Sequence, residues 1–77
     1  MLSTLHQLHI GCSARIVALM TSGEMRRRLL DIGFVPDAEV TCLFSGFSGD
    51  PRAYLIKNTV IALRSEDAET IIIQKGE

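Results

Sequence analysis

The sequence predicts a mostly β domain, a small barrel of about five short strands with one inserted helix. Three observations predict this class. Apolar and polar residues alternate with a period of two along much of the chain, and turn-forming glycine, proline and asparagine separate the alternating segments. The chain has only 77 residues, 47% of them hydrophobic, so its core is small and we expect a single domain over residues 1–77.

Five segments alternate in the way that is typical of strands, and they cover residues 13–20, 39–45, 53–57, 59–64 and 70–75. In the second of them we expect Val40, Cys42 and Phe44 to share one face, which we place on the inside. Asn58 separates the third and fourth segments and tolerates the positive φ of a tight hairpin. Before the first strand, leucines recur every three residues, which favours a short helical turn.

One helix is predicted over about residues 22–32. Thr21 and Glu24 have the spacing of a capping box, and Gly33 stands where a helix commonly ends in left-handed geometry. A serine followed by two acidic residues predicts a single helical turn near residues 65–69. A five-stranded sheet of this length closes most naturally into an SH3-like barrel, whose interior holds only side chains. Function is therefore expected on the loops and on the inserted helix.

Charge and hydropathy exclude several classes of function. Eight lysines and arginines against nine acidic residues give a net charge of -1, which argues against direct nucleic-acid binding. No apolar run approaches the roughly 18 residues of a membrane span, and no secretory signal is visible, so we expect a cytoplasmic protein without membrane insertion. Exchange of edge strands through residues 71–73 leaves self-association open. No nucleophile beside a base, phosphate-binding loop or carboxylate pair is evident, and we expect no enzyme.

Three segments occur in a fixed order with short spacers: residues 28–34 (RLLDIGF) with Pro36 after them, residues 49–51 (GDP), and residues 62–68 (ALRSEDA). Together they resemble the FeoA family, small cytosolic partners of the bacterial ferrous iron transporter FeoB. Leucines at 5 and 8 and the glycine at 11 match the opening of the family, so the resemblance covers nearly the whole chain. The residues that match its structural motifs are Arg28, Leu29, Asp31, Gly33, Gly49, Asp50, Pro51, Leu63 and Arg64.

The resemblance implies an SH3-like interaction module that binds the cytosolic region of FeoB and influences iron(II) uptake, with no required cofactor. Asp37 and Asn58 stand where the family usually has glycine, and both residue types enter left-handed geometry at modest cost. The same barrel occurs as the C-terminal module of metal-dependent repressors, so a stand-alone relative of that module is an alternative.

Two surface elements are candidates for partner binding. The loop at residues 45–52 carries Phe47 between two glycines and ends at Arg52. An exposed aromatic beside an arginine suits a partner anchor, although Phe47 could instead fold back into the barrel mouth. On the predicted helix, Arg26 and Arg27 could meet an acidic partner or simply be solvated. Arg28 is expected to pair with Asp31 three residues later.

The remaining candidates concern metal and local structure. His6, His9 and Cys12 recur every three residues, a spacing that could gather two imidazoles and a thiolate around zinc or iron(II). A regulatory or adventitious divalent metal is therefore the main alternative to a metal-free module. Surface histidines between core leucines explain the same pattern. Asp50 is expected to form a turn, and Arg64 to pair with the nearby Glu66 and Asp67.

Overall fold

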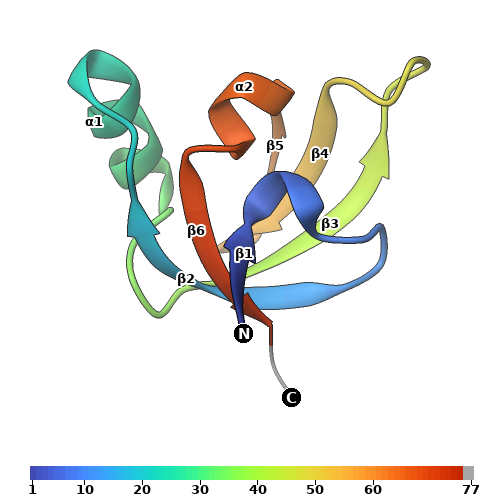
Figure 1. Cartoon of the computed structure of the whole chain (residues 1–77). Coiled ribbons are helices and arrows are strands. Elements are labelled where there is room, and N and C mark those ends of the chain that lie inside the picture. Colours follow the sequence, from blue (N-terminus) through green and yellow to red (C-terminus); the bar gives the residue numbers. More distant parts are fainter. Residues whose placement is uncertain (76–77) are drawn as a thin grey trace.

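The computed structural model describes residues 1–75, and Figure 1 shows one strongly curled antiparallel sheet with two short helices at its upper side. The elements in chain order are β1 (Leu2–Thr4), a 3-10 turn η1 (Leu5–Gln7), β2 (Ser13–Leu19), α1 (Gly23–Ile32), β3 (Glu39–Ser45), β4 (Arg52–Ile56), β5 (Thr59–Leu63), α2 (Ser65–Ala68) and β6 (Ile71–Lys75). The mostly β prediction is confirmed, with six strands in place of about five.

The additional strand is β1, which lies where the sequence predicted only a helical turn. It pairs antiparallel with β6, with Leu2 opposite Gln74 and Thr4 opposite Ile72. The helical turn itself is confined to η1. A strand of three residues is too short for a period of two to show in the sequence, because its stability comes from the neighbouring strand.

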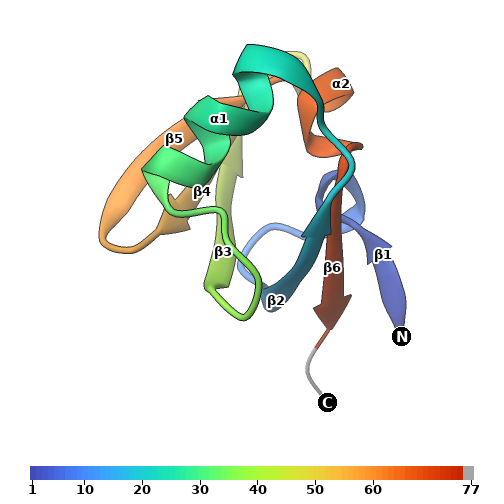
Figure 2. The same ribbon diagram turned by 90° about the vertical axis from the view of Figure 1, so that its left-hand side faces the viewer.

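The strands follow the spatial order β1-β6-β2-β3-β4-β5, so β6 is an inner strand. Ile71 and Ile73 are fully buried, and β1 and β2 flank this segment, so residues 71–73 are not the free edge through which strand exchange was considered. The edges of the sheet are β1 and β5. Helix α1 lies alongside β5 (Figure 2), and its Leu29 is buried in the common core.

The core fills the inside of the curled sheet and draws on every element except β1. Its fully buried large side chains are Tyr54, Phe34, Leu5, Leu8, Ile16, Leu29, Ile56, Ile71, Ile73, Val40 and Cys42. Cys42 therefore faces inward as predicted. None of the helices within residues 1–75 is long and apolar enough to cross a bilayer.

The ends of α1 are set differently from the predicted capping box. Ser22 is the N-cap residue and makes no side-chain cap bond, while the Thr21 hydroxyl lies 2.5 Å from that of Thr70. The capping-box prediction is wrong because the Thr21 hydroxyl is hydrogen-bonded to Thr70, the residue before β6, and not to the backbone at the start of α1. At the other end Gly33 has φ 128° and donates to the carbonyls of Leu29 and Leu30, which confirms the predicted cap.

The remaining turns agree with the sequence. Asn58 has φ 65° in the two-residue turn between β4 and β5, and Lys57 before it has φ 48°. Both central residues of this turn thus have positive φ, the geometry that matches the twist of paired strands. Asp37 likewise has φ 74°, so the two family glycine positions are left-handed in this chain. Helix α2 confirms the single turn near residues 65–69.

Candidate partner-binding surface

The loop between β3 and β4 presents Phe47 entirely to solvent. Its exposed fraction is 109%, so the alternative in which it folds back into the barrel mouth is wrong. Phe44, three residues earlier, is 59% exposed. Two exposed aromatic side chains at one end of the sheet make this end a candidate contact surface.

Phe44 was placed inside by simple alternation and lies outside in the structure. The pairing of β3 with β4 shifts register between Cys42 and Phe44, which is the signature of a β-bulge. One extra residue turns the following side chain to the opposite face. The sequence held no clear signal for the bulge, so this exposed aromatic was missed.

The base of the loop is tightly held. The Gly46 amide donates to the Pro51 carbonyl at 2.7 Å, and the Gly49 amide donates to the Gly46 carbonyl at 3.0 Å. A Cβ at position 46 would lie 3.0 Å from the Asp50 carbonyl oxygen and 3.2 Å from that of Pro51. Glycine is needed at this position because the two sides of the loop approach so closely. Phe47 is thus displayed from a fixed base.

Asp50 connects this loop to α2. One carboxylate oxygen accepts a hydrogen bond from the Ser65 amide at 2.8 Å, and the other lies 3.7 Å from Nη1 of Arg64. The first contact satisfies a backbone donor at the start of a helix, which is the task of a cap. Asp50 is therefore more than a turn former. Arg64 pairs with Asp50 and not with Glu66 or Asp67, because β4 and β5 bring the loop beside α2.

Arg52 follows the loop and points into the structure. Its Nη1 donates to the Leu8 carbonyl at 2.8 Å, which ties β4 to the segment after η1. Its Nε is buried and has no hydrogen-bond partner within residues 1–75, so the guanidinium lies inside the structure and is held through Nη1. Two residues of this loop were predicted to contact a partner. Phe47 is exposed and available for such a contact, whereas Arg52 is bonded to the Leu8 carbonyl.

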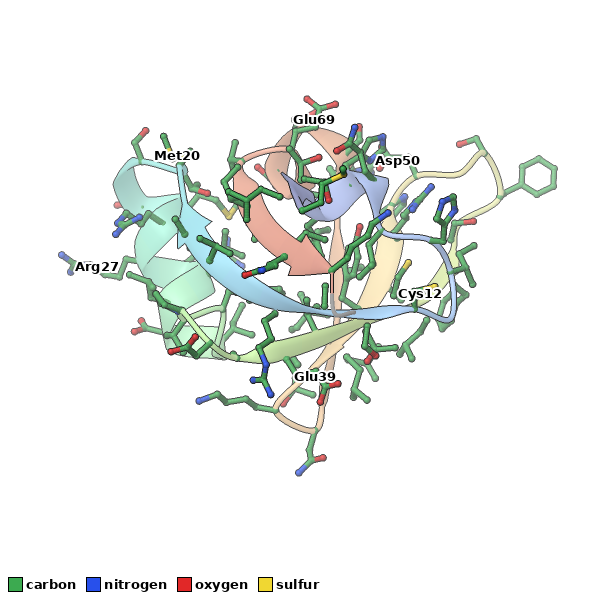
Figure 3. All side chains as sticks on the ribbon, turned by 60° about the horizontal axis from the view of Figure 1, so that its bottom comes forward. Cys12, Met20, Arg27, Glu39, Asp50 and Glu69 are labelled. Carbon is green, nitrogen blue, oxygen red and sulfur yellow. The ribbon has the colours of Figure 1, made fainter. Side chains whose placement is uncertain are left out.

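The three arginines of α1 have different surroundings. Arg26 donates from Nη1 to the Leu19 carbonyl at 2.8 Å, which fastens the helix to the end of β2. Arg27 points away from the molecule (Figure 3). Arg28 lines a hollow between α1 and β5. The expected pair between Arg28 and Asp31 is wrong. Within residues 1–75 the ion pair joins Arg64 to Asp50, and Arg28 lies at the hollow toward β5.

The two candidate binding elements lie on opposite sides of the protein. In Figure 1 α1 is at the left and the loop between β3 and β4 is at the upper right. The molecule measures 28 × 28 × 22 Å, so the loop and the exposed face of α1 are separated by most of its width. Phe47 and Arg27 are therefore two separate candidate contacts.

The three residues proposed for metal binding do not gather. His6 lies on η1 and is half-buried, while His9 and Cys12 are exposed on the turn that precedes β2. Over residues 1–75 the structure brings together no group of three or more His, Cys, Asp or Glu side chains that could hold a metal ion. The spacing of three therefore corresponds to the turn between η1 and β2, and a metal at these residues stays a prediction.

Tyr54 lies beneath the candidate surface and was not singled out from the sequence. It is fully buried, and its hydroxyl finds no hydrogen-bond partner within the described chain. Burial raises the pKa of Tyr54 to about 12; nearby Cys42 acts in the same direction and the Arg52 guanidinium in the opposite one. The phenol is therefore neutral at physiological pH and serves as core packing.

Comparison with known proteins identifies the family. Residues 3–75 match the FeoA domain. The chain belongs to the FeoA family. FeoA proteins are linked to ferrous iron transport and are small, non-enzymatic SH3-like accessory domains. Over 70 residues, 91% of its length, the chain is 36% identical to an Fe(2+) transport protein A/Fe(2+) transporter FeoB fusion protein from Porphyromonas gingivalis. It spans 8% of that fusion protein.

Solved FeoA structures share the fold. Iron(II) transport protein A from Clostridium thermocellum is 36% identical, with a TM-score of 0.88 over 94% of this chain and 44% of that one. FeoA from Stenotrophomonas maltophilia, complexed with zinc and described as a prokaryotic SH3 domain protein, is 28% identical, with a TM-score of 0.84 over 92% and 88% of the two chains. A manganese-dependent transcriptional repressor has a TM-score of 0.84 at 17% identity, over 96% of this chain and 36% of that one, which is a likeness of fold alone.

Proposed function

We propose that this chain is a cytosolic interaction module that binds the cytosolic region of FeoB and modulates iron(II) uptake. The observation that carries the proposal is the fusion relative, in which a segment 36% identical to this chain belongs to one polypeptide with FeoB. Covalent linkage raises the effective concentration of one module at another, and it is useful where the two act together. A separate chain needs a binding surface to reach the same arrangement.

The loop that carries Phe47 supports the choice of that surface. A fully exposed phenylalanine on a hydrogen-bonded base loses little conformational freedom on binding, so more of its burial energy contributes to affinity. Phe44, three residues earlier on β3, adds a second exposed aromatic side chain. Arg27, at the other side of the molecule, is the second candidate contact, and a partner that covers both residues would have to span most of the width of the domain.

Metal is not expected to take part in this binding. The zinc complex belongs to the S. maltophilia relative, and His6, His9 and Cys12 of this chain do not form a set that could hold an ion. We therefore propose an interaction module that needs no resident metal. A chelator should leave the affinity for FeoB unchanged, whereas a regulatory metal site would make the affinity depend on added divalent ion.

The proposal is tested by calorimetric titration of intact FeoB, in lipid nanodiscs and from the same genome, with this chain. Replacement of Phe47 by serine should weaken binding by about 10-fold to 30-fold, the range expected for loss of one aromatic anchor. Val60→Ser is the matched control, because Val60 is also exposed (57%) but lies on β5. Equal affinities for wild type and Phe47→Ser would refute the site, and no binding of wild type would refute the partner.

A further inference from the structure

The two cysteines of the chain lie opposite each other across neighbouring strands. The Gly11 amide donates to the Cys42 carbonyl at 2.6 Å, and the Cys42 amide donates to the Cys12 carbonyl at 3.0 Å. Gly11 has φ 88°. This pattern is a β-bulge in which Gly11 and Cys12 together oppose Cys42, and glycine supplies the left-handed conformation at its first position.

The side chains of the two cysteines belong to the same face of the sheet. The next pair, Ser13 and Thr41, places its hydroxyl oxygens 2.6 Å apart on the outside. The pair after that, Ala14 and Val40, is buried on the inside. Because side chains alternate along both strands, the Cys12–Cys42 pair faces inward like Ala14–Val40.

The two cysteines differ in their access to solvent. Cys42 is fully buried, whereas Cys12 is exposed at the rim, in the turn before β2 that is labelled in Figure 3. Cys12 can therefore be reached from solvent, whereas Cys42 is shielded from it on the neighbouring strand.

The spacing of the two backbones is compatible with a disulfide. Residues directly opposite in an antiparallel ladder have Cα atoms about 4.5–5.5 Å apart, inside the range of about 4.4–6.8 Å that disulfides occupy. We propose that Cys12 and Cys42 are a modification site that closes reversibly into an intramolecular disulfide when the protein meets a peroxide. The inference is independent of FeoB binding, since it concerns only residues of this chain.

The chemistry divides between the two positions. The exposed Cys12 sulfur attacks the O–O bond of hydrogen peroxide, which gives a sulfenic acid and releases water. The buried Cys42 thiol then attacks that sulfur, which forms the S–S bond and releases a second water. Overall two thiols lose two hydrogens and two electrons to one peroxide, and a reducing dithiol reverses the change.

Oxidation would fasten the turn at residues 9–12 to β3 by a covalent bond. Closure of a long loop between residues 12 and 42 restricts the unfolded chain, so the oxidised protein should melt about 10 °C higher than the reduced one. In a reducing cytosol such a bond is transient, as expected for a redox-responsive pair rather than a structural disulfide.

The test uses the reduced wild-type chain treated with stoichiometric hydrogen peroxide. We expect a monomer lighter by about 2 Da, loss of both alkylatable thiols, and a protease fragment in which Cys12 and Cys42 are linked. Recovery of both thiols with dithiothreitol should follow. A product in which Cys12 is over-oxidised or joined to a second chain, while Cys42 is still alkylated after denaturation, would overturn the proposal.

A matched variant tests the register itself. The double change Cys12→Ser with Ser13→Cys keeps two cysteines but moves one to the outer face, opposite Thr41. This variant should form no intramolecular disulfide under the same treatment. If it closed as readily as wild type, the facing geometry would not be the cause and the proposal would fail.

Discussion

At the scale of single residues, three polar side chains at the loop end of β4 do structural work that local sequence does not reveal. Asp50 bonds to the first amide of α2, and Arg52 bonds to the carbonyl of Leu8. Tyr54 is packed in the core with a neutral phenol. The residues that Asp50 and Arg52 contact are 15 and 44 positions away in the chain. The local sequence therefore predicted only a turn former at Asp50 and a partner contact at Arg52, and it did not single out Tyr54.

Tyr54 should make the free energy of unfolding depend on pH in the alkaline range. Its pKa is raised from 10.0 to about 12, so between these values the unfolded chain has lost the phenol proton while the folded chain retains it. The unfolded state then binds fewer protons, and the free energy of unfolding falls as pH rises. Wild type should lose about 1 kcal/mol more than Tyr54→Phe between pH 9 and pH 11.

Urea denaturation of the two proteins across this pH range measures the difference. Tyr54 is the one tyrosine of the chain, so phenolate absorbance also reports its ionisation directly. Near neutral pH, Tyr54→Phe should be as stable as wild type, because the hydroxyl has no partner in the part of the chain that the structure describes. Parallel pH profiles for wild type and Tyr54→Phe would show that the phenol is not protected by burial.

Asp50 is the residue on which the start of α2 depends. Asp50→Ala removes the acceptor for the Ser65 amide and should lower the free energy of unfolding by about 1–2 kcal/mol. Asp50→Asn keeps an acceptor oxygen and should cost less. Arg64→Ala should cost about 0–1 kcal/mol, because this arginine is mostly exposed. Chemical denaturation of the three variants ranks the contacts, and an Arg64→Ala loss larger than that of Asp50→Ala would contradict the capping role.

At the scale of elements, local sequence patterns predicted most of the strands and helices. They failed where pairing with a neighbouring strand determines the structure. The helix at 22–32 and the segments that became β2 to β6 follow from periodicity and turn residues, which are local. The missed strand β1 exists only because it pairs with β6. Phe44 was assigned to the wrong face because a bulge, set by pairing with β4, interrupts the alternation.

The loop between β3 and β4 depends on Gly46. In Gly46→Ala the new methyl group would meet backbone oxygen atoms of Asp50 and Pro51 at 3.0–3.2 Å, and backbone cannot move away as a flexible side chain can. We expect a loss of about 1–3 kcal/mol in stability and a changed loop. Amide chemical shifts at residues 45–52 and thermal unfolding measure both effects. Gly49→Ala is the comparison, since a Cβ there meets no atom within 4 Å, although its φ of 89° is also strained in alanine.

At the scale of the whole molecule, the sheet order brings together family segments that are distant in sequence. Residues 49–51 and residues 64–65 meet through the Asp50 carboxylate, which gives a physical reason for their joint occurrence. No local sequence pattern predicts the strand order β1-β6-β2-β3-β4-β5. The distance between the Phe47 loop and α1 follows from that order and could not be predicted either. The resemblance predicts FeoB as the partner, and the exposure of Phe47 makes one end of the barrel the proposed contact surface.

The most direct test of the central claim is an amide-resolved NMR titration of the labelled chain with the soluble cytosolic region of FeoB from the same genome, with metal removed by a chelator. Binding through the Phe47 loop predicts saturable shifts concentrated at residues 44–52, while residues 26–28 on the opposite side report whether α1 is also covered. Shifts confined to other surfaces, or no response at saturating concentration, would contradict the proposed interaction.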